Sequence, residues 1–279
     1  MTQSEFSVLI PVYYRENPIF FREALRSIFE NTLVAKEVIL VCDGPLTEAL
    51  EDVIAEFTSF KSLIVLRKPQ NSGIVDCLNI GLNACSTELV VRCDSDDIND
   101  PERFSKLIKK LESGWDIVGS NIKEIDHQGR LLWSKKVPQS PGDIAKMIQS
   151  RNPINHMTVA YRRELILSLG GYPNVFLRED YALWAIAIGR GALICNIQED
   201  LVLARAGFDM YQRRRGLKSA IAELRLQRLL VRESVSTLPL AMCYGTLRFF
   251  SFLLPGSLLG LLYSRLLRYS PGAKKQMPN

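Results

Sequence analysis

The chain has 279 residues, of which 47% are hydrophobic and 23% charged, and its net charge is +5. This length and composition exclude a disordered chain, a fibrous repeat and a small disulfide scaffold, and they predict a folded globular protein of one or two domains. The charge is uneven, because residues 200–279 hold 13 Lys and Arg against 4 Asp and Glu. The basic character therefore belongs to the last quarter of the chain.

The first hundred residues alternate between short apolar runs and segments with helical spacing. The runs are too short for buried helices and predict strands, and the apolar residues between them recur three or four apart, which predicts helices. Such alternation is typical of an α/β fold with a parallel sheet, whose ligand crevice lies at the carboxyl ends of the strands. The expected strands are 7–13, 38–42, 63–66 and 89–93, and the expected helices are 20–30, 46–60 and 74–85.

The second hundred residues predict a mixed rather than a purely parallel arrangement. A helix is expected first, then strands of which two are joined by a polar turn, and then a mainly helical region ending in a basic helix. The expected strands are 116–119, 122–125, 131–135 and 192–197, and the expected helices are 101–112, 142–150, 164–169, 179–190 and 216–233.

Six cysteines are spread along the chain, four of them in apolar segments, and none forms a CxxC pair. We expect reduced thiols packed in the core, which favours a cytoplasmic protein. No basic segment precedes an apolar stretch at the N-terminus, so no secretion signal is expected.

Acidic side chains stand at positions where the crevice is expected. Asp43 follows the second strand, the cluster Asp94–Asp97 follows the fourth, and Glu179 and Asp180 begin a helix. Three carboxylates within four residues repel one another unless a cation or donors compensate, which makes Asp94–Asp97 a candidate Mg²⁺ or Mn²⁺ site. The alternative is that these acids cap the next helix or lie in a solvated loop.

Several common catalytic signatures are absent from the sequence. It has no GxxxxGK[ST], GxGxxG, HExxH or GxSxG motif, so a phosphate loop, a dinucleotide fold, a zinc protease and a serine hydrolase are not indicated. Of the two histidines, His127 lies in a polar turn. His156 follows a proline-containing loop and is either near the crevice or a structural side chain.

Six short segments follow one another along the chain: SVLIPVY at 7–13, VCDG at 41–44, NSGI at 71–74, CDSDD at 93–97, GGY at 170–172 and ED at 179–180. Together they resemble the family 2 glycosyltransferases over roughly residues 5–230, and most nearly the bacterial polysaccharide enzymes of the amylovoran type. The resemblance implies a GT-A fold with a Rossmann-like, mostly parallel sheet. Its domain would span 1–233, with a nucleotide-binding half at 1–100, an acceptor half at 101–233, and a C-terminal helical segment at 234–279.

The resemblance also implies a reaction and its residues. The reaction is an inverting, metal-dependent transfer of a sugar from a nucleoside diphosphate sugar, preferably a UDP-sugar, to a saccharide or polyprenyl-linked acceptor in surface polysaccharide biosynthesis. Asp96 would bind Mn²⁺ or Mg²⁺ beside Asp94 and Asp97, and Asp180 would be the catalytic base. Asp43 would accept a hydrogen bond from the nucleotide base, although Cys42 stands where the family usually has another acid. Further residues implied at the nucleotide are Pro11, Tyr13, Glu16, Asn71, Gly73, Asp94 and Ser95, and those near the acceptor or diphosphate are His156, Glu179 and Arg213.

Two other functions stay open from the sequence. A sugar nucleotidyltransferase would need a glycine-rich basic signature near the first strand, which Pro11–Glu16 does not supply. A non-catalytic, membrane-associated binding module on the same fold is the other. We expect no nucleic-acid partner, and a homo-oligomer is left open.

The C-terminal segment is apolar and flanked by basic residues. Between Ser234 and Ser264 the only charge is Arg248, and the uncharged run 249–263 would form a helix of about 22 Å. This is shorter than a hydrocarbon core of about 30 Å, so we expect peripheral contact through 234–268 with the cytoplasmic face of a bacterial inner membrane. The alternative is a helical pair packed on the acceptor half or on another subunit.

Overall fold

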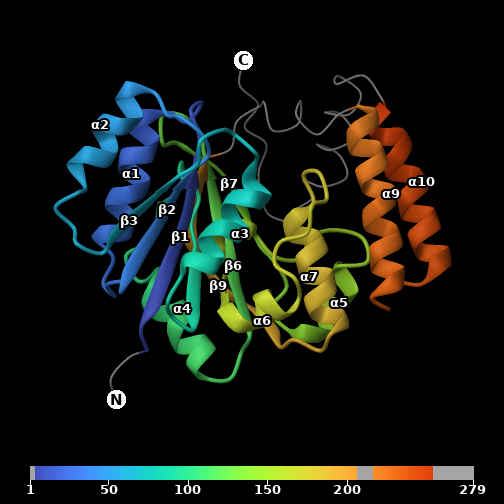
Figure 1. Ribbon diagram of the computed structural model, residues 1–279. Coiled ribbons are helices and arrows are strands. Elements are labelled where there is room, and N and C mark those ends of the chain that lie inside the picture. The colour runs from blue at the N-terminus through green and yellow to red at the C-terminus, as the bar shows by residue number, and fades with distance from the viewer. Residues whose placement is uncertain (1–3, 206–215, 254–279) are drawn as a thin grey trace.

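The computed structural model describes residues 4–205 and 216–253. Their nine strands form one sheet in the order β3-β2-β1-β4-β8-β6-β9-β5, with β7 added to β6, and helices cover the sheet (Figure 1). The elements are β1 (Phe6–Val12), α1 (Pro18–Phe29), β2 (Glu37–Cys42), α2 (Glu48–Glu56), β3 (Leu63–Arg67), α3 (Ile74–Ala84), β4 (Leu89–Arg92), β5 (Ile98–Asn99), α4 (Arg103–Glu112), β6 (Ile117–Ile125), β7 (Leu131–Lys135), α5 (Pro141–Met147), η1 (His156–Thr158), β8 (Ala160–Arg162), α6 (Arg163–Ser168), α7 (Glu179–Gly189), β9 (Ile194–Arg205), α9 (Leu217–Arg232) and α10 (Leu238–Leu253).

The first half is the predicted parallel α/β unit. Strands β3, β2, β1 and β4 are parallel, with Val8 aligned to Val38 on one side and to Val91 on the other. Alternate strand residues face opposite cores, so Val8 packs with α1, α2 and α4 and Leu9 packs with α3 and α7. The strand order reverses between β1 and β4, which is where a crevice forms at the carboxyl ends of such strands.

The second half is mixed, as expected. Strand β8 lies antiparallel between β4 and β6, while β9 runs parallel to β6. The separate strands predicted at 116–119 and 122–125 are wrong, because β6 is one strand whose register against β9 shifts at Ser120–Ile122. The polar residues there bond to groups outside the strands: the Ser120 amide donates to Thr158 Oγ1 of η1 (2.9 Å), and Asn121 Oδ1 accepts from the Val137 amide after β7 (2.9 Å).

Three further differences concern element length. The strand expected at 192–197 continues to Arg205, because its polar middle lies at the register shift rather than ending the strand. The helix expected at 46–60 is only Glu48–Glu56. Strands β5 and β8, two and three residues long, carry too little pattern to be predicted from the sequence.

The last two described helices form a pair beside α7 (Figure 1). Helix α9 confirms the predicted basic helix, and α10 packs against it. Among the described residues, no helix is both long and apolar enough to cross a membrane. Residues 254–268 of the expected membrane-contact segment lie outside the described residues. All six cysteines are free thiols, five of them buried.

Candidate functional site

The carboxyl ends of β1, β2 and β4 lie side by side and carry most of the predicted donor-site residues. The Asp43 amide donates to the Val12 carbonyl (2.8 Å), and the Cys93 amide donates to the Leu9 carbonyl (2.9 Å), so the segments after β2 and β4 both run along the end of β1. Pro11 lies near the end of β1, and Tyr13 follows it, half-buried.

Asp43 is a buried carboxylate that fastens the loop after β3. Its Oδ1 accepts from Lys68 Nζ and from the Ser72 amide, and its Oδ2 accepts from the Gly73 amide, all at 2.9 Å. Burial disfavours the charged form, but the hydrogen bonds from Lys68 and the two amides outweigh it and hold the pKa of Asp43 below its usual value. Asn71 Nδ2 donates to the Asp43 carbonyl (3.3 Å), so Asp43, Asn71 and Gly73 form one group.

The two oxygens of Asp43 are unequally engaged. Oδ1 accepts two hydrogen bonds, whereas Oδ2 accepts the one from the Gly73 amide, and the Cys77 thiol also hydrogen-bonds this carboxylate. The loop approaches closely at Gly44, where φ is +86° and a Cβ would lie 2.7 Å from the Asn71 amide nitrogen. Only glycine allows this approach.

The acids after β4 form a compact cluster. Carboxylate oxygens of Asp94, Asp96 and Asp97 all lie within 4.8 Å of one another. Burial first, and then the charges of Asp94 and Glu16, raise the pKa of Asp96 to about 7. Burial, Asp96 and Asp94 raise the pKa of Asp97 well above its ordinary range. The protein therefore holds three mutually repelling carboxylates close together.

This cluster fits a divalent cation. Asp97 Oδ2 is buried and accepts no hydrogen bond from any residue that the structure describes. Hard oxygen ligands of this kind suit Mg²⁺ or Mn²⁺, whose charge would offset the burial and the mutual repulsion that raise these pKa values. Ser95 Oγ donates to Glu16 Oε2 (2.7 Å), so the segment after β1 lies against this cluster.

Arg205, at the end of β9, hydrogen-bonds the loop that carries Asp94–Asp97. Its amide donates to Asp97 Oδ1 (2.8 Å), and its guanidinium hydrogen-bonds the Asp96 carbonyl and pairs with Glu23 of α1. The guanidinium also lies over the Phe20 ring, 4.2 Å from the centroid. The unpredicted extension of β9 thus fixes the predicted metal site.

Asp180 lies in the first turn of α7 with both carboxylate oxygens oriented. Its Oδ2 accepts from Asn152 Nδ2 (2.6 Å), and its Oδ1 accepts from the Tyr181 amide (2.7 Å). Each oxygen keeps one lone pair, so the carboxylate can still accept a proton. Burial and the adjacent Asp180 charge raise the pKa of Glu179 to about 7.

His156 and Tyr172 lie beside this pair of acids. His156 Nε2 is 3.2 Å from Tyr172 Oη, and burial first, then the positive charge of Arg92, lower the pKa of His156 well below its ordinary value. The turn before Tyr172 depends on Gly171, where φ is +74° and a Cβ would lie 2.4 Å from Asn79 Oδ1. The GGY segment therefore docks Tyr172 onto α3 through Asn79, whose side chain bonds both the Tyr172 amide and carbonyl.

Arg92 connects the two groups of acids. This buried side chain, 2% exposed, pairs with Asp94 and exerts its charge on His156, Tyr172 and Glu179. The metal-type cluster and the Asp180 region therefore surround one buried cation. The arrangement can hold an anionic diphosphate through a metal on one side and deprotonate a hydroxyl on the other.

Sequence reasoning missed four residues of this arrangement. Lys68 could have been found, because it follows β3 at the same edge of the sheet as Asp43. The other three carry no local signal. Asn152 lies in a loop, Arg92 lies in an apolar strand, and Arg205 lies at the end of a strand that the pattern predicted to be shorter. The predicted Arg213 lies outside the described residues.

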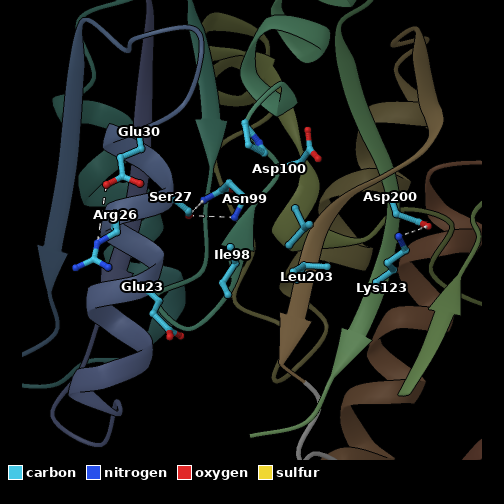
Figure 2. A pocket seen from close by; sticks show the side chains of 12 residues that line it. Glu23, Arg26, Ser27, Glu30, Ile98, Asn99, Asp100, Lys123, Asp200 and Leu203 are labelled. Carbon is cyan, nitrogen blue, oxygen red and sulfur yellow. Dashed lines mark hydrogen bonds and ion pairs between the residues drawn. The ribbon is translucent and has the colours of Figure 1, made fainter. Parts of the chain in front are cut away.

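A cavity of about 450 Å³ lies elsewhere. It is bordered by α1, β5 and β9, and Lys123 and Asp200 close one side (Figure 2). None of its lining residues belongs to the predicted site.

The sequence is similar to those of known proteins over most of its length. A family model described as Glycosyl transferase family 2 matches residues 7–169. The UDP-Gal:alpha-D-GlcNAc-diphosphoundecaprenol beta-1,3-galactosyltransferase of Escherichia coli is 36% identical over 267 residues, which is 95% of this chain and 97% of that protein. The amylovoran biosynthesis glycosyltransferase AmsE of Erwinia amylovora is 34% identical over 262 residues, 93% of this chain and 98% of that protein.

A solved structure shares the fold. The mannosyltransferase PcManGT from Pyrobaculum calidifontis, in complex with GDP-Man and Mn²⁺, matches 97% of this chain and 82% of its own with a TM-score of 0.62 and 18% identity. At this identity the likeness concerns the fold alone.

Proposed function

The chain belongs to glycosyl transferase family 2 and is a glycosyltransferase with a GT-A fold; from this premise we propose that it transfers a sugar from a UDP-sugar to a lipid-linked saccharide, with inversion and with a divalent cation. One observation carries the proposal. Buried Arg92 pairs with Asp94 of the acid cluster, and its charge also acts on Asp97 and on Glu179, the residue before the oriented carboxylate of Asp180.

The donor side is derived from the acids at the sheet edge. Asp96, with Asp94 and Asp97, would hold Mn²⁺ or Mg²⁺, which when bound supplies positive charge to the departing nucleoside diphosphate. The Asp43 carboxylate is an acceptor that suits uracil N3–H, and equally the N3–H of thymine or the N1–H of guanine, so the preference for a UDP-sugar rests on the relatives. The E. coli relative is named for UDP-Gal, whereas the structural neighbour holds GDP-Man.

The acceptor side is derived from the start of α7. Asp180 takes the proton from the acceptor hydroxyl. As it does so, the hydroxyl oxygen attacks the anomeric carbon of the donor sugar on the side opposite the leaving nucleoside diphosphate. A single displacement of this kind inverts the anomeric configuration. Asn152 and the Tyr181 amide hold the carboxylate during this step, and general base catalysis contributes typically 10²–10⁴-fold to the rate.

A lipid-linked acceptor agrees with the surface of α9 and α10. The exposed charges of α9 are all basic, and its one acid, Glu223, is buried. Helix α10 exposes an apolar side that includes Met242, Leu247 and Phe250. Basic and apolar side chains together fit an anionic bilayer surface, each basic residue contributing about 1 kcal/mol, which would place the enzyme at the cytoplasmic face of a bacterial membrane. The exposed basic residues are Lys218, Arg225, Arg228 and Arg232.

Membrane contact has its own test. Full-length protein should sediment with vesicles of phosphatidylglycerol and phosphatidylethanolamine but not with phosphatidylcholine alone. Arg225→Glu combined with Arg228→Glu should abolish the sedimentation. Equal sedimentation of this variant, or binding to neutral vesicles, would contradict a basic docking surface.

The reaction is tested with a panel of sugar nucleotides: UDP-galactose, UDP-glucose, UDP-N-acetylglucosamine, GDP-mannose and dTDP-glucose, each with Mn²⁺ and α-GlcNAc-diphosphoundecaprenol. We expect transfer from one UDP-sugar, a β-linked product from the α-linked donor, and loss of transfer in EDTA. Transfer undiminished by EDTA would remove the cation from the account. Transfer to no acceptor, with no nucleotide binding, would favour a non-catalytic module, and a sugar nucleotide formed from a sugar phosphate would favour a nucleotidyltransferase.

A further inference from the structure

A buried charged cluster joins the C-terminal helices to the start of α7. Glu223 of α9 is completely buried, yet it is an acid on a helix whose other charges are exposed. Its Oε2 lies 3.3 Å from Arg178 Nε, and its Oε1 lies 3.4 Å from Arg248 Nη1 and accepts from Gln227 Nε2 at 2.8 Å. One carboxylate therefore bridges two arginines from different segments.

The first arm of this cluster leads to the residue before the acid pair. Arg178 is the N-cap residue of α7, two positions before Asp180. Its Nη1 donates to the Leu177 carbonyl (2.8 Å), and its guanidinium lies over the Phe252 ring of α10, 5.2 Å from the centroid. Leu177 has a φ of +53°, a conformation that costs a non-glycine residue energy and persists only where the surroundings hold it.

The second arm leads to the loop that orients Asp180. Arg248 of α10 donates through Nη2 to the Ser150 carbonyl, two residues before Asn152. The Tyr181 hydroxyl donates to the Ile148 carbonyl, which ties the same loop to α7. Asn152 then contacts Asp180 Oδ2 at 2.6 Å.

We propose that the Arg178–Glu223–Arg248 cluster is a positioning device through which the α9–α10 pair holds the Asp180 carboxylate and its partner Asn152 in register. The loop at 148–152 and the start of α7 meet directly through the Asn152–Asp180 and Tyr181–Ile148 hydrogen bonds, and the cluster joins both of these segments to the α9–α10 pair. The role of Asp180 as base is the proposed function, so this inference rests on it. The C-terminal helices are then part of the acceptor-side machinery as well as a docking surface.

The same helix supplies a matched control. Glu233, at the other end of α9, is also buried and also lies between two arginines, Arg190 at 3.4 Å and Arg232 at 2.8 Å. Its partner Arg190 follows the last turn of α7, at the end of that helix opposite Asp180. Glu223→Gln and Glu233→Gln therefore remove equivalent charges and differ in which end of α7 they release.

Amide hydrogen exchange on the full chain tests the link without a substrate. Glu223→Gln should speed exchange in residues 148–153 and 177–181, and Glu233→Gln should speed it only near 189–191. Arg248→Lys keeps the charge but loses the two-armed fork, and it should affect 148–153 most. Unchanged exchange at 148–153 and 177–181 in both Glu223→Gln and Arg248→Lys would overturn the proposal.

Kinetics test whether the link acts through the base. With the substrates that the wild type uses, Glu223→Gln should lower kcat roughly 10-fold to 100-fold while donor KM stays unchanged, because misplacement of about 1 Å has effects of this size. In an Asp180→Asn background the same change should have little further effect. If Glu233→Gln lowers kcat equally, or if Glu223→Gln lowers kcat as much in the Asp180→Asn background as in the wild type, the loss of kcat would come from general destabilisation of the protein. If Asp180→Asn retains full activity, the proposed function fails and the exchange result stands separately.

Discussion

Replacing Asp43 with asparagine should destabilise the protein through the loop that borders the proposed nucleotide site. Asparagine keeps one acceptor oxygen, but its amide group would face the Gly73 amide donor, and Lys68 would lose its counter-charge. Leaving a buried donor unsatisfied costs about 1–3 kcal/mol, and losing the ion pair adds to it, so we expect a total of about 3 kcal/mol. At about 2–4 °C for each kcal/mol, this lowers the thermal midpoint by roughly 6–12 °C.

The pH dependence of the difference in thermal midpoint between wild type and Asp43→Asn identifies the cause of that difference. The folded-state pKa of Asp43 is depressed, so its stabilisation is fully present above the unfolded-state value of about 3.9 and is lost as pH falls toward the folded-state value. Thermal unfolding followed by circular dichroism should show the same gap between wild type and Asp43→Asn at pH 7 and pH 5, and a narrower gap at pH 3.5. Glu56→Gln, which removes an exposed ion pair with Arg22, is the control and should leave the midpoint nearly unchanged. A midpoint for Asp43→Asn within about 1 °C of wild type at pH 7 would refute the reasoning.

The other predictions concern the acids and their partners. Asp180→Asn should lower kcat by roughly 10²–10⁴-fold with donor KM nearly unchanged; a normal transfer rate in steady-state assays would exclude it as the base. Asn152→Ala should lower kcat roughly 10-fold at unchanged donor KM, and an unchanged kcat would mean that the Tyr181 amide alone orients Asp180. Asp96→Asn should raise the thermal midpoint of the metal-free protein. Because the Asp96 pKa is raised to about 7, ionisation of this carboxyl costs the wild type stability increasingly from about pH 4 to 7, so the gain in midpoint should be larger at pH 8 than at pH 5. An equal gain in midpoint at both pH values would argue against charge repulsion.

The parallel half of the fold and its acids could be predicted because the signal is local. Strands such as β2, with six buried residues, are continuous apolar runs, and whatever follows them falls on one edge of the sheet. That rule alone brought Asp43 and Asp94–Asp97 to the crevice. The mixed half was predicted less well, because Ser120 and Asn121 look like a strand end until their partners Thr158 and Val137 are known.

The support behind the site could not be predicted, because its residues meet only in the folded chain. Arg92 reads as an interruption of an apolar strand, yet it pairs with Asp94 at the centre of the site. Glu223 reads as one more charge on a basic helix, yet it is buried between Arg178 and Arg248. In both cases the deciding contact spans elements whose packing the local pattern does not specify.

The central claim is that the Asp94, Asp96 and Asp97 carboxylates bind a divalent cation that holds a nucleoside diphosphate. Isothermal titration of UDP into the wild-type protein, with Mn²⁺ and again in EDTA, tests it most directly. The account predicts heat of binding with Mn²⁺, little in EDTA, and little for Asp96→Asn under either condition. UDP binding of equal affinity in EDTA and in Mn²⁺ would contradict it.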